Sequence, residues 1–189
     1  MMQASSLRNG IFCVLAAFSL TAPVSASKAA DQAVKTPVIQ NYGALRADTD
    51  VGELPDLTLR YRVVFEITRS ASEAGAVNPA LDRLARFVNL LGAAGIRPKP
   101  GDIVAVIHGA ATPTVLADPA YEARFNRPNP DAALIQALAR AGVAVHVCSY
   151  ALGNQNIAHA DVAQGIKVDL AAMMTLANLQ LKGWALIAG

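Results

Sequence analysis

The feature that most constrains the fold is the alternation of short apolar runs with helical segments that open on an Asn-Pro pair. Residues 103–107 and 142–148 are uncharged at neutral pH and rich in Val, Ile and Ala, as is typical of strands buried on both faces. The pairs at 78–79 and 129–130 place a capping Asn before a Pro at the first helical position. Helices between buried strands predict a mainly parallel sheet.

The remaining elements fit the same pattern. Alternating and then apolar residues at 59–68 predict a first strand, residues 165–168 predict a short one, and residues 184–187 predict the last. Residues 110–125 have short helical potential, and Asp169 is interpreted as the cap of a final helix. Apolar positions at three- and four-residue spacing support the helices: Leu81, Leu84, Phe87, Val88 and Leu91; Leu134, Ile135 and Leu138; and Leu170, Met173, Met174, Leu176, Leu179 and Leu181. The sequence therefore predicts an α/β domain of five strands.

The amino-terminal residues are typical of an export signal. Arg8 precedes an apolar run at 11–20, and small residues lead to Ala26, as in a signal peptide with its cleavage site. The alternative, a membrane anchor, needs about 20 apolar residues. We expect a signal peptide at 1–26, a loosely packed leader arm at 27–56 and one domain at 57–189. The mature protein is then expected to be periplasmic or secreted, with no membrane attachment.

Composition and motifs exclude several function classes. The chain has 16 Lys and Arg against 14 Asp and Glu, for a formal net charge of +2, and neither sign forms a block. No nucleic-acid partner is therefore expected. The chain also lacks G-x-S-x-G, a Walker A loop and a dinucleotide-binding glycine pattern after a strand. We expect no cofactor.

One cysteine remains after signal cleavage, because Cys13 lies within the signal. Cys148 ends an apolar run and is followed by a loop-like stretch at 149–153. The carboxyl end of a buried strand is where open α/β sheets bind ligands. A lone thiol is inert packing, an intermolecular bridge or a reactive group, and the sequence leaves all three open.

A set of motifs resembles the DsrE/DsrF-like family over residues 60–188. These are His108-Gly109 after one strand, Asn129-Pro130 before a helix, Cys148 at the end of the next strand, and Leu179-Gln180 with Gly183 before the last. The chain is most similar to the exported branch. The resemblance implies a three-layer α/β/α fold, assembly into trimers or hexamers, and a sulfur relay in which a cysteine at the position of Cys148 carries a persulfide.

The resemblance also implies that His108 and Cys148 end neighbouring strands, so that both reach one crevice. An imidazole beside a thiol favours the thiolate, which is the nucleophile in sulfur chemistry. We therefore predict Cys148 and His108 as the catalytic residues. His146 shares a strand face with Cys148 but lies deeper, where a hydrogen-bonded core histidine is expected. His159 is expected in an exposed loop.

Polar residues near the thiol are candidates for ligand contact, although surface loops are polar for solubility anyway. The predicted ligand-binding residues are Gly109, Ser149, Tyr150, Asn154 and Asn126; Gln155, Asn156, Arg124 and Arg127 are further candidates. The histidines and Cys148 lack the paired short spacings of structural zinc sites, so no metal site is predicted.

Two functions follow as hypotheses. The first is an exported DsrE-like protein that binds or relays a sulfur species through Cys148, with a sulfur donor or acceptor protein as partner and no independent turnover. The alternative is a non-catalytic oligomeric module, structural or ligand-binding, whose cysteine is inert. A small hydrolase or transferase using Cys148 and His108 is a third class, but the sequence shows no acidic residue to orient the histidine.

Overall fold

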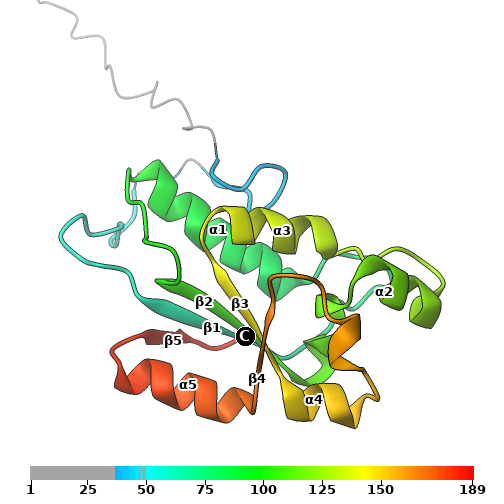
Figure 1. The fold of residues 1–189 in the computed structure, drawn as a ribbon. Coiled ribbons are helices and arrows are strands. Elements are labelled where there is room, and N and C mark those ends of the chain that lie inside the picture. The colour runs from blue at the N-terminus through cyan, green and yellow to red at the C-terminus, as the bar shows by residue number, and fades with distance from the viewer. Residues whose placement is uncertain (1–36, 47, 49) are drawn as a thin grey trace, which may run out of the picture. The chain divides into compact units, whose positions relative to one another are not determined.

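The structure is a computed structural model that describes residues 37–46, 48 and 50–189. The predicted signal peptide and residues 27–36 of the predicted leader arm lie outside the described residues. Five strands, β1 (Val63–Ile67), β2 (Ile103–Ile107), β3 (Ala144–Cys148), β4 (Lys167–Asp169) and β5 (Ala185–Ile187), form one sheet in the order β4-β3-β2-β1-β5 (Figure 1). All four pairings are parallel. The predicted α/β class and five-stranded parallel sheet are confirmed.

Helices cover both faces of this sheet. Helices α1 (Pro79–Ala93) and α3 (Ala132–Arg140) lie on one side, which we call the first face, and α4 (Ser149–Asn154) and α5 (Ala172–Leu181) lie on the other, the second face (Figure 1). Helix α2 (Asp118–Phe125) and two 3-10 helices, η1 (Gly109–Val115) and η2 (His159–Asp161), complete the connections. The layers are therefore α/β/α.

Alternation along the strands divides the core in two. Phe65, Ile107 and Val147 point to the first face, where they pack with buried leucines of α1 and α3. The second face has a smaller apolar cluster, made of Val64, Val104, Val106, Cys148, Ala151, Ala172 and Leu176. Cys148 thus belongs to the thinner layer of the core.

Three local predictions differ from the structure. Residues 149–154 form α4 instead of a loop, so Cys148 directly precedes a helix. Asp169 does not cap α5, because α5 begins at Ala172 and the carboxylate binds other side chains. Helix α3 begins at Ala132, two residues after the Asn-Pro pair, although Asn129 Oδ1 still accepts a hydrogen bond from the Asp131 backbone N–H at 3.0 Å.

The apolar residues of α5 also depart from expectation. Among the six predicted to be apolar helix positions, Leu176 is buried and Leu179 half-buried. The other four are exposed: Leu170, Met173, Met174 and Leu181. Since α5 is apolar on nearly every side, its sequence did not define which side would face the sheet.

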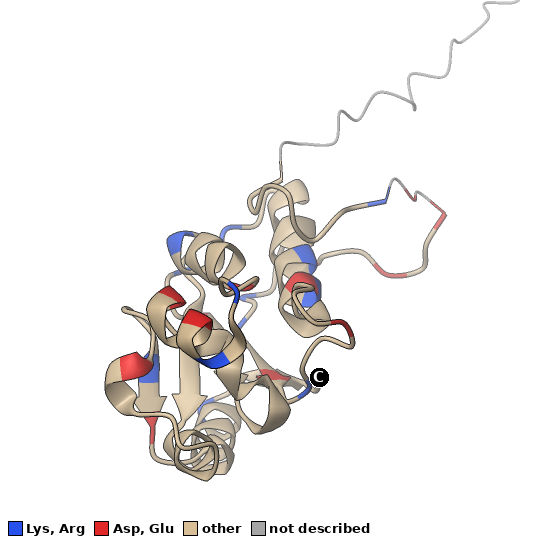
Figure 2. Cartoon of the chain, turned by 90° about the vertical axis from the view of Figure 1, so that its right-hand side faces the viewer, with Lys and Arg blue, Asp and Glu red and all other residues tan. Residues whose placement is uncertain are grey.

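Charged residues of both signs are mixed over the helices, as Figure 2 shows for one side of the molecule. One ion pair joins an exposed arginine to a buried carboxylate: Arg60 donates to both carboxylate oxygens of Asp102, at 2.8 and 3.2 Å. The Arg60 hydrogen bonds lower the pKa of Asp102 against the opposing effect of burial. Within the described part of the chain, no helix is long and apolar enough to cross a bilayer.

Candidate active site at the carboxyl edge of the sheet

The candidate site lies on the second face, where β2 and β3 end side by side. The register pairs Ile107 with Val147, so the next residues, His108 and Cys148, follow on adjacent strands. Adjacent strands lie about 4.8 Å apart. The backbone N–H of His108 donates to the Ile67 carbonyl at 3.0 Å, which extends the β1–β2 pairing by one residue. The expectation that these two strands are neighbours is therefore met.

Cys148 is a free and buried thiol, 7 % exposed. It packs with Val106 of β2, Ala151 of α4, and Ala172 and Leu176 of α5. Residues of both α4 and α5 therefore share the apolar cluster that covers the thiol. A reagent or ligand can reach it only if that cover shifts or if the approach runs along the carboxyl edge of the sheet.

His108 is held by an acidic residue from the neighbouring strand. Its Nε2 lies 3.0 Å from Oε1 of Glu66, and both side chains are about one-quarter exposed. Glu66 alternates with Phe65 and Ile67, which places it on the second face with the thiol. When Nε2 donates to Glu66, the Nδ1 of a neutral ring is left as an acceptor. This arrangement supplies the acidic orienter that the sequence did not reveal.

A second imidazole–carboxylate pair lies on the other side of the thiol. Nδ1 of His146 is 2.6 Å from Oδ2 of Asp169, and the Thr175 hydroxyl donates to the same oxygen at 2.7 Å. Burial alone would raise the pKa of Asp169. The hydrogen bonds from Thr175 and His146, with the positive charge of Lys167, outweigh it and lower the pKa below 3.8. His146 is thus the hydrogen-bonded core histidine that the sequence predicted.

Several predicted ligand-binding residues gather at this edge. Gly109 has a φ of +59° and follows His108 directly; a Cβ there would lie 3.0 Å from the Thr68 carbonyl oxygen. Its own carbonyl accepts a hydrogen bond from Nε2 of Gln155 at 2.7 Å, which ties the end of α4 to the His108 loop. The Ser149 hydroxyl lies 3.1 Å from Nε2 of His159, an exposed residue as expected.

Other predicted residues lie farther out on these elements. Tyr150 is 65 % exposed on α4, and Asn154 is an exposed residue at the end of that helix. Asn126 adopts a left-handed conformation, φ +54°, as the cap that ends α2. Arg124 of α2 donates to the Gln155 carbonyl at 2.7 Å, so α2 does reach the loop after α4. Asn126 therefore serves to end α2, and the structure shows no contact between it and the thiol.

Sequence reasoning missed Glu66, Asp169 and Thr175. Glu66 could have been recognised from the sequence, since it is the one charged residue within the apolar run that forms β1. Asp169 was noticed but interpreted as a helix cap. No group of three or more His, Cys, Asp or Glu residues within the described ranges is arranged to hold a metal ion.

The molecule also has a pocket of about 500 Å³ on the first face, between α3 and residues 163–166. Leu116, Ile135 and Val145 are among its lining residues. None of the predicted site residues lines it. The pocket is therefore separate from the candidate site around Cys148.

Comparison with known proteins supports the fold and the family. The chain matches two solved structures, each over 68 % of its own length and 99 % of theirs with a TM-score of 0.50: a protein of unknown function from Methanobacterium thermoautotrophicum, 20 % identical, and the ychN protein from E. coli, 14 % identical. At these identities the likeness shows the fold alone. No curated protein matches. The model of the DsrE/DsrF-like family matches residues 61–188, which include every strand and helix described above. The chain therefore belongs to the DsrE/DsrF-like family.

Proposed function

We propose that this chain is an exported DsrE-like protein that binds or relays a sulfur species through Cys148, without turnover of its own. The observation that best supports this function is the position of the thiol. It lies at the carboxyl end of β3, next to a histidine that Glu66 orients at 3.0 Å. A nucleophile, an adjacent base and an acidic orienter are the parts that activated thiols require.

The proposed step moves one sulfane sulfur atom. Cys148 gives its proton to His108, and its thiolate attacks the outer sulfur of a donor persulfide, R–S–SH. The S–S bond of the donor breaks, R–S⁻ leaves and takes up a proton, and Cys148 becomes a persulfide. No external oxidant or reductant is needed, because the sulfane sulfur keeps its oxidation state. Delivery to an acceptor thiolate is the same exchange in reverse.

Intact mass spectrometry tests this function directly. Mature protein that begins near Ser27, and therefore lacks Cys13, is treated with a low-molecular-weight persulfide and measured with and without reductant. The proposal expects a mass increase of one or more sulfur atoms that reductant removes and that the Cys148→Ala variant does not show. Unmodified wild-type protein after such treatment would refute it.

The roles of His108 and Glu66 have their own test. General-base assistance contributes factors of about 10² to 10⁴, so the His108→Ala variant should be alkylated by iodoacetamide at least about tenfold more slowly at neutral pH. The Glu66→Gln variant should show a smaller decrease, since Gln still contacts the ring. An unchanged rate in His108→Ala would remove His108 from the mechanism while leaving the thiol as carrier.

One observation favours the alternative function, a structural module with an inert cysteine. Cys148 is buried among apolar residues, where it is also a suitable packing residue. The two functions differ in a simple measurement. A relay thiol is modified in the native protein, whereas a packing thiol is modified only after denaturant exposes it.

We further propose that the functional form is a homo-oligomer, a trimer or hexamer. The support is a set of exposed apolar side chains on α5 and just before it: Leu170, Met173, Met174 and Leu181. A second copy would remove these side chains from water. Light scattering at micromolar concentration should give the mass of three or more chains, and a monomer would contradict the proposal.

Export is tested at the amino terminus. The signal pattern at 1–26 expects a mature chain that begins near Ser27 in the periplasm or medium. Amino-terminal sequencing of secreted material checks the cleavage site. Material that still begins at Met1 would contradict this part of the proposal.

A further inference from the structure

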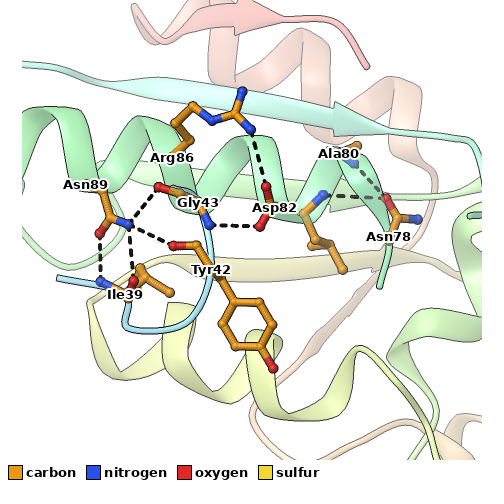
Figure 3. Close-up of polar contacts among 9 residues, drawn as sticks. Ile39, Tyr42, Gly43, Asn78, Ala80, Asp82, Arg86 and Asn89 are labelled. Atoms are coloured by element: carbon orange, nitrogen blue, oxygen red, sulfur yellow. Dashed lines mark hydrogen bonds and ion pairs between the residues drawn. The ribbon is translucent and has the colours of Figure 1, made fainter. Parts of the chain in front are cut away.

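A short segment before the sheet is bound along α1 by side chains of that helix (Figure 3). Oδ1 of Asn89 accepts a hydrogen bond from the Ile39 backbone N–H at 2.7 Å. Nδ2 of Asn89 donates to the carbonyl oxygens of Ile39, Tyr42 and Gly43 at 3.0 to 3.1 Å. Oδ1 of Asp82 accepts from the Gly43 N–H at 2.7 Å. Helix α1 therefore recognises the main chain of residues 39–43, as peptide-binding sites do.

Two further contacts select particular side chains. Ile39 is 1 % exposed and joins the apolar cluster of the first face. Gly43 has a φ of +61°, and a Cβ there would lie only 2.2 Å from the backbone nitrogen of Arg86. Any other residue at this position would be strained and would collide with the helix. Asn41, with a φ of +67°, also has a conformation that Asn accepts more readily than most residues.

Asn89 has no evident reason to be polar apart from this segment. It is 1 % exposed on the buried side of α1, and the hydrogen bonds of its side chain within the described residues all go to residues 39–43. Without the segment, the Asn89 side chain would lose all four of these hydrogen bonds. The helix therefore carries a preformed polar site inside an apolar surface.

Residues 39–43 are bound to α1 by their own hydrogen bonds and not by packing of the residues that follow them. In the stretch that follows it, Val51, Leu54, Leu57 and Leu59 are all exposed. A pocket of about 510 Å³ lies between the segment, at Val38 and Tyr42, and α3, at Ala137 and Arg140. The segment thus lies on the helix as a tethered ligand would, next to space that it does not fill.

We propose that α1 carries a recognition site for a peptide of the pattern Ile-x-Asn-x-Gly in a turn conformation, and that residues 39–43 occupy it as an intramolecular ligand. Asn89 and Asp82 bind the peptide main chain, the first face receives the isoleucine, and the close approach to Arg86 requires the glycine. This site is separate from Cys148. A tether of this kind gives an effective concentration on the order of millimolar, so only a displaced segment leaves the site open to a peptide in trans.

The test uses the full chain with a Gly43→Val substitution, which displaces the segment, and a labelled peptide of residues 37–45. Fluorescence anisotropy should show saturable binding to Gly43→Val at least about tenfold tighter than to wild type, in which the tethered segment competes. A peptide carrying the same Gly→Val change should not bind. Adding Asn89→Ala to the Gly43→Val chain should abolish binding. Absence of binding to folded Gly43→Val protein would overturn the proposal.

Hydrogen exchange of the wild-type chain provides a test that needs no variant. If the segment is a separable ligand, the amides of Ile39 and Gly43 exchange through a local opening that leaves the Leu84 and Val88 amides protected. Exchange of all four amides only through global unfolding would show that the segment is an integral part of the core, and would equally overturn the proposal.

Discussion

The two faces of the sheet differ in what they bury, although the same strands supply both. The first face packs Phe65, Ile107 and Val147 against the leucines of α1 and α3, in a large apolar cluster. The second face has a small cluster of mostly Val and Ala, edged by the Glu66–His108 and His146–Asp169 pairs. Alternation along each strand thus lets one side supply stability while the other carries a thiol and titratable groups.

Matched leucine substitutions should separate the two faces most strongly. Leu84→Ala on the first face should lower the free energy of unfolding by about 4 kcal/mol, because a fully buried leucine leaves a cavity. Leu176→Ala on the second face should cost only about 2 kcal/mol, since that side chain is partly accessible at 9 %. Urea denaturation measures both. Leu176→Ala should also speed alkylation of Cys148, which belongs to the same apolar cluster, and Leu84→Ala should not.

Equal losses from the two substitutions would show that the second face contributes as much to stability as the first.

A buried carboxyl on the first-face side gives the next largest effect. Asp131, 3 % exposed before α3, has a pKa raised to about 6 by burial, which its hydrogen bond from the Asn78 N–H only partly offsets. Because the folded pKa exceeds the unfolded one, the contribution of Asp131 to stability is fully present below about pH 4 and is lost as pH rises through about 6, by about 3 kcal/mol in all.

The Asp131→Asn variant keeps an acceptor for Asn78 but cannot ionise. We expect it to be more stable than wild type by about 2 to 3 kcal/mol at pH 8 and to lack the decline between about pH 4 and pH 7. Denaturation of both proteins across this range is the measurement. Parallel pH profiles would contradict the assignment of the decline to Asp131.

Thr175→Val tests the polar edge of the second face. Removal of one hydrogen bond to Asp169 should lower stability by about 1 kcal/mol, while Thr175→Ser should behave like wild type. Since the Asp169 pKa is lowered in the folded state, its contribution is present above 3.8 and is lost as pH falls through the folded value. The variant should therefore lose this contribution at a higher pH, which a titration of the Asp169 carboxyl by NMR would record.

Ser149→Ala should have the smallest effect, because its contact with His159 is exposed. We expect a change of stability below about 0.5 kcal/mol and an unchanged alkylation rate of Cys148. A large decrease in that rate would extend the site to Ser149 and His159.

The strand runs were predictable because burial on both faces leaves an uninterrupted apolar sequence. The pairing of β2 with β3 could be anticipated only through the family resemblance, and it places His108 beside Cys148. The carboxylate partners were not predictable in the same way. Glu66 meets His108 and Asp169 meets His146 across neighbouring strands, so these contacts depend on a strand order that no local pattern encodes.

Short or uniformly apolar elements also escaped prediction. Helix α4 has six residues, too few for a helical period to emerge from the sequence. Helix α5 has apolar residues all round, so its buried side was set by packing against Val64, Val104 and Val106 and not by its own pattern. The docking of Ile39 on α1 was missed because its composition suggested a loose arm, whereas one buried Asn holds it.

The strand order has a consequence for how the chain folds. Strand β1, the first to be synthesised, lies between β2 and β5, and Val63 pairs with both Ile103 and Ala185. Until the last strand arrives, β1 presents an open edge whose N–H and C=O groups can pair with another chain. Contacts this distant in sequence form slowly. A ribosome-bound or truncated chain that ends before β5 would therefore remain incomplete and prone to aggregate, and completion of the sheet must wait until nearly the whole sequence has emerged.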